Sequence, residues 1–85
     1  MEKTIIVSNE SGLHARPAGL LVSKAKNYAS DIQIKYQDKI VNAKSIMNLL
    51  SLGLSKGSEI TIITKGDDEE KALNELVDLL ENQLD

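Results

Sequence analysis

The chain contains one proline, Pro17, and this residue constrains where a helix can begin. Proline has a fixed φ and no backbone N–H, so it fits the first turn of a helix and disrupts a helix interior. The apolar residues after it have helical spacing: Ala18, Leu21, Val22 and Ala25. Together these features predict an amphipathic helix over residues 16–27 that begins next to the proline.

The only histidine, His14, lies just before this predicted helix, in the sequence GLHARPA of residues 12–18. A helix N-terminus offers free backbone N–H groups and the positive end of the helix dipole, and both favour anions. Arg16 adds a permanent charge with a forked donor set that suits phosphate. Because imidazole is a nucleophile near neutral pH, this segment predicts a histidine that accepts a phosphoryl group. A solvated or capping histidine remains the plainer alternative on spacing alone.

Short β-branched or alternating runs and apolar periodicity predict the remaining elements. Strands are expected at residues 4–8, 31–36, 39–42 and 58–64, with a turn at Gln37 and Asp38. Further helices are expected at residues 46–52, stopped by Gly53, and after Gly66, with an inward stripe of Leu73, Leu76, Val77 and Leu80. Asp67 is expected to cap the last helix, and Glu70 to complete a capping box. The order β-α-β-β-α-β-α predicts a two-layer α+β fold.

Composition excludes several functions. The 85 residues suffice for a single domain over residues 1–85, and the net charge of −3 with only two tyrosines speaks against direct nucleic-acid binding. The chain lacks cysteine, so disulfides and cysteine metal sites are excluded and a zinc site is not expected. Without a long apolar run or a signal-peptide segment, we expect a soluble cytoplasmic protein with no membrane insertion.

Two motifs in order resemble the HPr family, the histidine-containing phosphocarriers of the bacterial phosphoenolpyruvate-dependent sugar phosphotransferase system. The first is GLHARPA at residues 12–18, which is similar to the phosphohistidine signature of the family. The second is KSIM at residues 44–47 followed by Leu52 and Gly53, which is similar to its regulatory-serine signature in Gram-positive bacteria. The resemblance covers essentially the whole chain, so it is far more specific than either motif alone.

The resemblance implies an open-faced β-sandwich, in which three helices cover one face of a four-stranded antiparallel sheet. It implies that His14 is the phosphoacceptor, through Nδ1, and that Arg16 faces the phosphate. The phosphoryl group would come from enzyme I and pass to enzyme IIA domains, so the chain would be a phosphocarrier with no cofactor and not an enzyme. Ser45 would be the target of HPr kinase/phosphorylase.

Partners are expected to bind around His14 and on the short helix after Ser45. That helix has more apolar residues than one buried stripe needs, so some must face outward. The expected contact residues are Ala15, Pro17, Leu20, Ile46, Met47 and Leu50. Because its partners would bind only transiently, we expect the chain to be a monomer. Asn48 stands where many family members carry glycine, and Leu50 where some carry methionine; both departures lie by the regulatory-serine motif and outside the His14 motif.

Three alternative functions remain beside the sugar carrier. The first is a regulatory protein whose phosphorylated Ser45 makes it a corepressor for a catabolite-control transcription factor; the presence of His14 argues against this as its only role. The second is a carrier in a nitrogen-related branch of the same system. The third is a binding module in which His14 has no chemical role. Ser45 also has a plain structural role, because serine is among the best N-cap residues.

Overall fold

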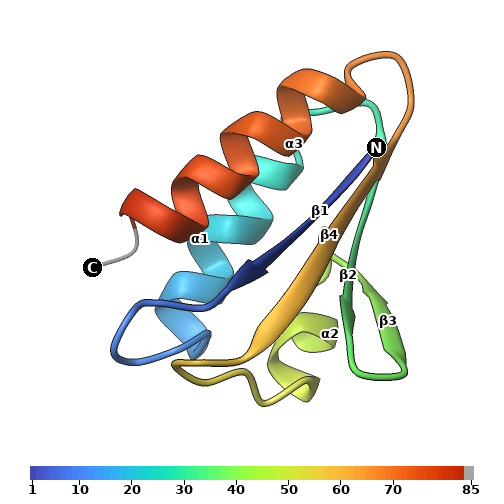
Figure 1. Ribbon diagram of the computed structural model, residues 1–85. Coiled ribbons are helices and arrows are strands. Elements are labelled where there is room, and N and C mark those ends of the chain that lie inside the picture. Colours follow the sequence, from blue (N-terminus) through green and yellow to red (C-terminus); the bar gives the residue numbers. More distant parts are fainter. Residues whose placement is uncertain (84–85) are drawn as a thin grey trace.

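Four strands form one antiparallel sheet in the order β1-β4-β2-β3 in a computed structural model that describes residues 1–83 (Figure 1). The strands are β1 (Glu2–Ile6), β2 (Asp31–Tyr36), β3 (Lys39–Asn42) and β4 (Glu59–Lys65). The helices are α1 (Ala15–Ala25), α2 (Ile46–Ser51) and α3 (Glu69–Asp78), and α3 continues as a π-helical turn, η1 (Leu79–Gln83). The element order is the predicted one, and no helix within residues 1–83 has the length and hydropathy to cross a membrane.

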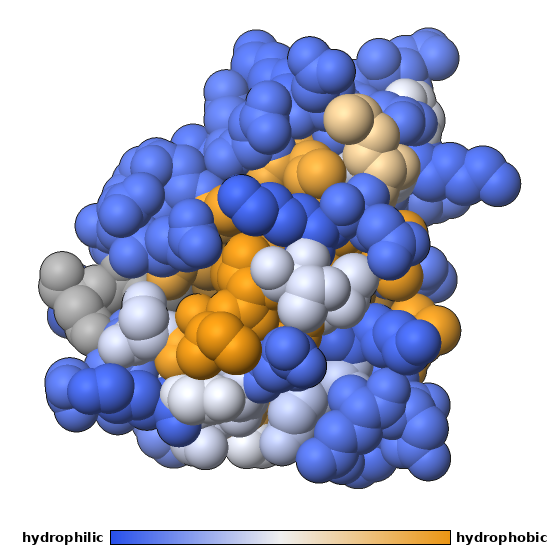
Figure 2. Space-filling view, viewed as in Figure 1, coloured by the Kyte–Doolittle hydropathy of each residue, from blue (hydrophilic) through white to orange (hydrophobic). Residues whose placement is uncertain are grey.

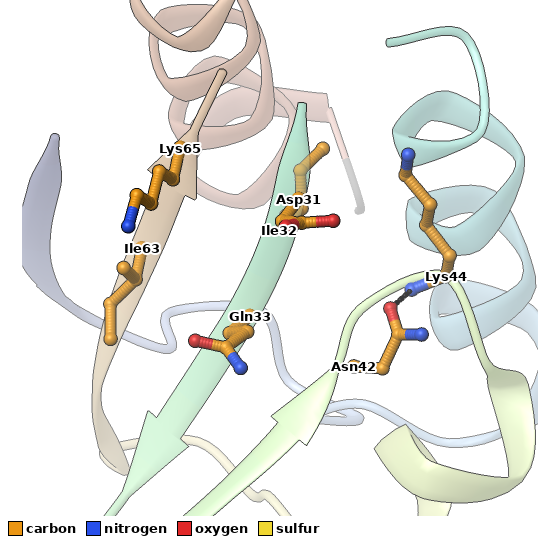
Figure 3. Close-up of a pocket in the computed structure, with 7 residues that line it drawn as sticks. All are labelled: Asp31, Ile32, Gln33, Asn42, Lys44, Ile63 and Lys65. Carbon is orange, nitrogen blue, oxygen red and sulfur yellow. Dashed lines mark hydrogen bonds between the residues drawn. The ribbon is translucent and has the colours of Figure 1, made fainter. Parts of the chain in front are cut away.

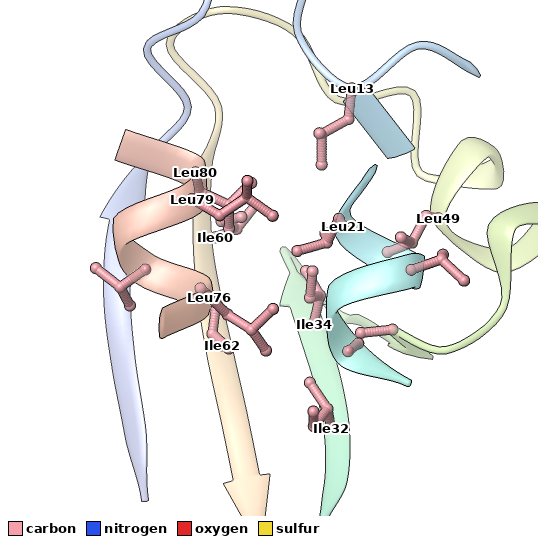
Figure 4. Packing of buried hydrophobic residues seen from close by; sticks show 14 of the residues in the cluster. Leu13, Leu21, Ile32, Ile34, Leu49, Ile60, Ile62, Leu76, Leu79 and Leu80 are labelled. Carbon is pink, nitrogen blue, oxygen red and sulfur yellow. The ribbon is translucent and has the colours of Figure 1, made fainter. Parts of the chain in front are cut away.

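The three helices lie on one face of the sheet, and aliphatic side chains fill the space between the two layers (Figures 1 and 4). From the sheet, Ile34 of β2 lies opposite Ile62 of β4, and both are almost fully buried. From the helices, Leu21, Leu49 and Leu76 pack into the same core. Each such side chain contributes roughly 1.5–3 kcal/mol on burial, so a core without phenylalanine or tryptophan holds the layers together. This arrangement confirms the predicted open-faced sandwich.

The edge strand β1 is less well covered than the centre of the sheet. Figure 2 shows a band of hydrophobic atoms that reaches the surface in the middle of the view, where β1 lies in Figure 1, with hydrophilic atoms around it. Ile6, at the end of β1, is 51% exposed.

The bounds of β1 differ from the predicted strand at residues 4–8 by two residues. The strand runs from Glu2, opposite Ile63, to Ile6, opposite Glu59. Pairing with β4 sets the first and last residues of β1, and local β-propensity cannot indicate where that pairing begins and ends.

The N-terminus of α3 differs from the predicted one. The helix begins at Glu69 with Asp68 in the N-cap position, so the predicted cap at Asp67 and the box with Glu70 are wrong. The Asp68 carboxylate does not cap its own helix. It accepts hydrogen bonds from the backbone N–H groups of Ala29 and Ser30, at 2.9 and 3.0 Å, and from the Ser30 hydroxyl. A tertiary contact with the two residues before β2 thus replaces the local capping box.

This contact predicts a pH dependence of stability. Hydrogen bonds from Ser30 and Ala29 hold the pKa of Asp68 below its ordinary value, and a bond from the Gly66 N–H does the same for the pKa of Glu69. A lowered folded-state pKa stabilises the fold above the ordinary pKa, and this stabilisation is lost as pH falls through the lowered value. We expect Asp68→Asn to lower the melting temperature at pH 7 and the deficit to shrink below about pH 4. A deficit that grows on acidification would contradict this account; thermal unfolding at several pH values measures it.

Candidate functional site

The loop between β1 and α1 delivers His14 to the helix, and Gly12 fixes its path. Gly12 has φ +63°, in the left-handed region that favours glycine. A Cβ at this position would lie 2.5 Å from the backbone oxygen of Leu54, so the two chains touch here without room for a side chain. The next residue, Leu13, is buried, and its N–H donates to the same Leu54 oxygen at 3.2 Å. The loop is thereby held against the segment before β4.

His14 occupies the N-cap position of α1, with an exposed side chain. Its backbone oxygen accepts the N–H of Ala18 at 2.9 Å, which is the first bond of the helix. The imidazole makes no capping hydrogen bond. The N–H groups of Ala15 and Arg16 lie in the first turn and have no intrahelical acceptor, and Pro17 has no N–H. The helix start therefore presents two backbone donors beside an accessible imidazole.

A surface hollow of about 580 Å³ adjoins His14. Its lining residues are Ser11, His14, Ala15, Arg16, Pro17, Leu20 and Gln83. The first turn of α1 contains no acidic residue, so the charge in this turn is the guanidinium of Arg16. The structure thus brings together His14, Arg16 and the helix N-terminus, an arrangement that suits a phosphoryl group on the imidazole.

Sequence reasoning did not identify two polar members of this hollow. Ser11 lies in the loop just before Gly12, and its hydroxyl adds a possible hydrogen-bond donor. Gln83 comes from η1, at the other end of the chain. Proximity to His14 could have indicated Ser11, whereas no sequence pattern links Gln83 to a site almost 70 residues earlier. No group of three or more possible metal ligands occurs among the described residues.

The predicted contact residues divide into two sets. Leu20, Ile46 and Leu50 are 38–45% exposed and Met47 is 74% exposed, so these four form an accessible apolar surface, here called the α1–α2 surface. A Cβ on Gly19 of α1 would lie 3.8 Å from the Cδ1 atom of Ile46, so the two helices adjoin at this surface. Ala15 is exposed, whereas Pro17 is buried and takes part only as a wall of the hollow. Ile46, Met47 and Leu50 lie outside that hollow.

Ser45 is half-buried and caps α2, as its structural role requires. Its Oγ accepts the N–H of Asn48 at 3.3 Å, and its backbone is extended with φ −121°. We expect Ser45→Ala to lower the free energy of unfolding by about 1 kcal/mol, because the Asn48 N–H loses its partner. Chemical denaturation measures this difference. A Ser45→Asp variant, which can still cap, is the control, and equal losses in both variants would contradict the capping role.

A second hollow, of about 500 Å³, lies on the opposite, helix-free face of the sheet (Figure 3). Its lining residues are Asp31, Ile32, Gln33, Asn42, Lys44, Ile63 and Lys65. The Lys44 N–H donates to the Asn42 side chain at 2.9 Å, and the Lys44 ammonium donates to the backbone oxygen of Tyr28 at 2.8 Å. This hollow contains no histidine and no hydroxyl nucleophile, so the hollow at His14 is the candidate site.

Comparison with known proteins agrees with this fold and shows the family. The family model described as the PTS HPr component phosphorylation site matches residues 1–82. An HPr from Thermoanaerobacter tengcongensis is 49% identical, with a TM-score of 0.92 over 95% of this chain and 91% of that one. The phosphocarrier protein HPr from Bacillus anthracis is 46% identical, with a TM-score of 0.92 over 95% and 96%. The catabolite repression protein Crh of Bacillus subtilis, solved as a domain-swapped dimer, is 43% identical, with a TM-score of 0.79 over 93% and 91%.

Proposed function

The chain belongs to the HPr family of phosphocarrier proteins of the phosphotransferase system, which are not enzymes, and we propose that it carries the phosphoryl group on His14. The observation that carries this proposal is the position of the chain's only histidine. Its exposed imidazole stands at the N-terminus of α1, in one hollow with Arg16. An anion on that imidazole meets two backbone donors and a guanidinium.

The proposed reaction is a transfer between imidazoles. A ring nitrogen of His14, which we take to be Nδ1, attacks the phosphorus of the phosphohistidine on enzyme I. The N–P bond in the donor breaks as the new one forms, and the donor imidazole leaves. Enzyme IIA then takes the group from His14 in the same way. No cofactor enters either step.

A carrier must hold its phosphoryl group only moderately, because it has to release it. Contacts with a helix N-terminus stabilise an anion by about 0.3–2 kcal/mol. The hollow at His14 is open and its imidazole is exposed, so solvent weakens the attraction of Arg16 further. These moderate interactions suit a group that passes on to the next protein.

The α1–α2 surface is the proposed contact for enzyme I and for enzyme IIA. Apolar contacts among accessible side chains suit several partners in turn, and Met47 adapts because its side chain is unbranched and flexible. Both partners would cover the same surface, so the chain would bind them one at a time. We propose that it does so as a cytoplasmic monomer.

The experiment is a reconstituted relay. Enzyme I, phosphoenolpyruvate, Mg²⁺ and an enzyme IIA are combined with a small amount of the chain, and phosphorylation of enzyme IIA is followed by mass. We expect enzyme IIA to be phosphorylated in excess over the chain, and Met47→Glu to slow the relay while leaving the melting temperature unchanged. The exposed Glu59→Gln on β4 is the control. A relay that proceeds equally without the chain would refute the proposal.

A second proposed function is regulation through Ser45. Two observations favour it: Ser45 precedes the exposed Ile46 and Met47, and Crh, called a catabolite repression protein, is a structural neighbour. A phosphate there adds a charge of about −1.5 to −2 beside the α1–α2 surface, which would repel an acidic partner and attract an arginine-bearing transcription factor. Incubation with HPr kinase/phosphorylase and ATP tests this. One acid-stable phosphate, absent from Ser45→Ala and retained in His14→Ala, is expected; no phosphate would exclude this role.

A further inference from the structure

We infer that Asn9 is a positioning residue for His14: its buried side-chain amide fixes the peptide group through which the loop enters the site. The inference rests on the proposed function of His14. Asn9 lies five residues before the histidine and is only 4% exposed, although asparagine usually lies at the surface. It belongs to none of the motifs that mark the site.

The Asn9 side chain closes a four-residue turn. Its Nδ2 donates to the backbone oxygen of Gly12, and the Gly12 N–H donates back to the backbone oxygen of Asn9 at 3.1 Å. The Oδ1 atom of Asn9 is buried with no hydrogen-bond partner among the described residues. Burying an unpaired polar atom is unfavourable. The position therefore carries an amide at a cost to stability, which is explained if the Nδ2 donor is needed.

The bond from Asn9 has a counterpart on the same peptide group. The group that joins Gly12 to Leu13 presents its oxygen to Asn9 and its N–H to the backbone oxygen of Leu54, at 3.2 Å. Both polar atoms of this peptide are thus held, one from each side. The loop and the segment before β4 lie side by side at the lower edge of Figure 1. Only Leu13 separates this fixed peptide group from His14. The orientation of the peptide group therefore sets where the imidazole lies relative to the helix N-terminus.

The chemistry of the Asn9 bond provides a direct test. The Gly12 oxygen is an acceptor, so residue 9 must supply a donor. In Asn9→Asp a carboxylate of nearly the same shape would face that oxygen and repel it. Burial disfavours the charged form, so on acidification the variant becomes a neutral acid whose O–H can donate again. The charged groups at this turn are Glu10, which is exposed and lies within it, and Lys56, which pairs with Glu10 at 2.6 Å.

The first measurement is the rate of charging by enzyme I, as a ratio to the unsubstituted chain, from pH 8 to pH 5.5. We expect Asn9→Asp to be about tenfold slower at pH 8, the loss of roughly one hydrogen bond, and to recover as pH falls. The control is Asn42→Asp, the same change in an exposed turn, where the side chain accepts the Lys44 N–H and a carboxylate still can. A ratio for Asn9→Asp that stays near one at all pH values would overturn the inference.

A second variant keeps the test decisive if Asn9→Asp does not fold at pH 8. Asn9→Ala removes the donor and adds no charge. We expect hydrogen exchange of the Leu13 amide to accelerate at least tenfold, while amides of β4 exchange as before. Unchanged Leu13 exchange would show that Asn9 does not hold this peptide. This readout needs no phosphorylation, so it separates failure of the inference from failure of the proposed carrier function, which would leave the unsubstituted chain uncharged.

Discussion

Replacing His14 with alanine is expected to abolish phosphorylation by enzyme I and to leave the fold intact. The imidazole is exposed and makes no capping hydrogen bond, so its loss should change the free energy of unfolding by no more than about 0.5 kcal/mol. The chain has no second histidine and no cysteine that could replace it as nucleophile. Intact mass after incubation with phosphoenolpyruvate and enzyme I, together with a thermal melt, measures both effects.

An Arg16→Gln variant is the control for that experiment. It retains the imidazole and loses the guanidinium, so it should still be charged, more slowly and with a shorter-lived product. His14→Ala and Arg16→Gln together therefore separate the group that reacts from the group that holds the phosphate. Undiminished phosphorylation of His14→Ala would show that another residue accepts the group.

Gly12→Ala is expected to destabilise the whole fold by about 2–5 kcal/mol. A left-handed backbone costs a residue with a Cβ roughly 1–2 kcal/mol, and forcing that atom against neighbours adds about 1–3 kcal/mol. The new Cβ would lie 2.5 Å from the Leu54 oxygen and 2.7 Å from the Cα of Ser55. Both are backbone atoms, which cannot move away by a change of rotamer as side-chain atoms can. Each kcal/mol lowers the melting temperature of a domain this small by about 4–8 °C, so a thermal melt reveals the change.

Gly53→Ala is the matched control for Gly12→Ala. Gly53 has φ +62°, almost the value of +63° at Gly12, and a Cβ there would meet nothing within 4 Å. Its loss of stability should therefore be the conformational cost alone, about 1–2 kcal/mol. The difference between the two variants measures the close approach of the His14 loop to Leu54. Equal losses would contradict that contact as the reason for glycine at position 12.

Periodicity predicted the elements well where one face is buried. The alternation of Ile32 and Ile34 and the stripe of Leu73, Leu76 and Leu80 all point into the core, and the hairpin turn lies at Gln37 and Asp38 as expected. These patterns succeed because burial of one face depends on spacing along the chain. Pro17 placed the start of α1 within one residue for a similar local reason: the helix begins at Ala15 and not at residue 16, and it ends at Ala25, two residues before the predicted end.

The failures involve contacts between distant segments. Asp68 binds Ser30, just before β2, and does not cap α3, and no pattern in residues 66–70 indicates that Ser30 lies nearby. Gln83 lines the hollow at His14 because the packing of α3 carries it there. The turn at Asn9 resembles an ordinary polar loop in the sequence, since its burial depends on the segment before β4. Pairing and packing between segments decide all three.

The most direct test of the carrier function is to locate the phosphoryl group. The chain is incubated with phosphoenolpyruvate, Mg²⁺ and enzyme I, digested at alkaline pH, and its peptides are analysed by mass spectrometry before and after acid treatment. The account predicts one phosphoryl group, on the peptide that holds His14, which acid removes. Phosphate that is absent, or that is acid-stable and on a peptide without His14, would contradict it.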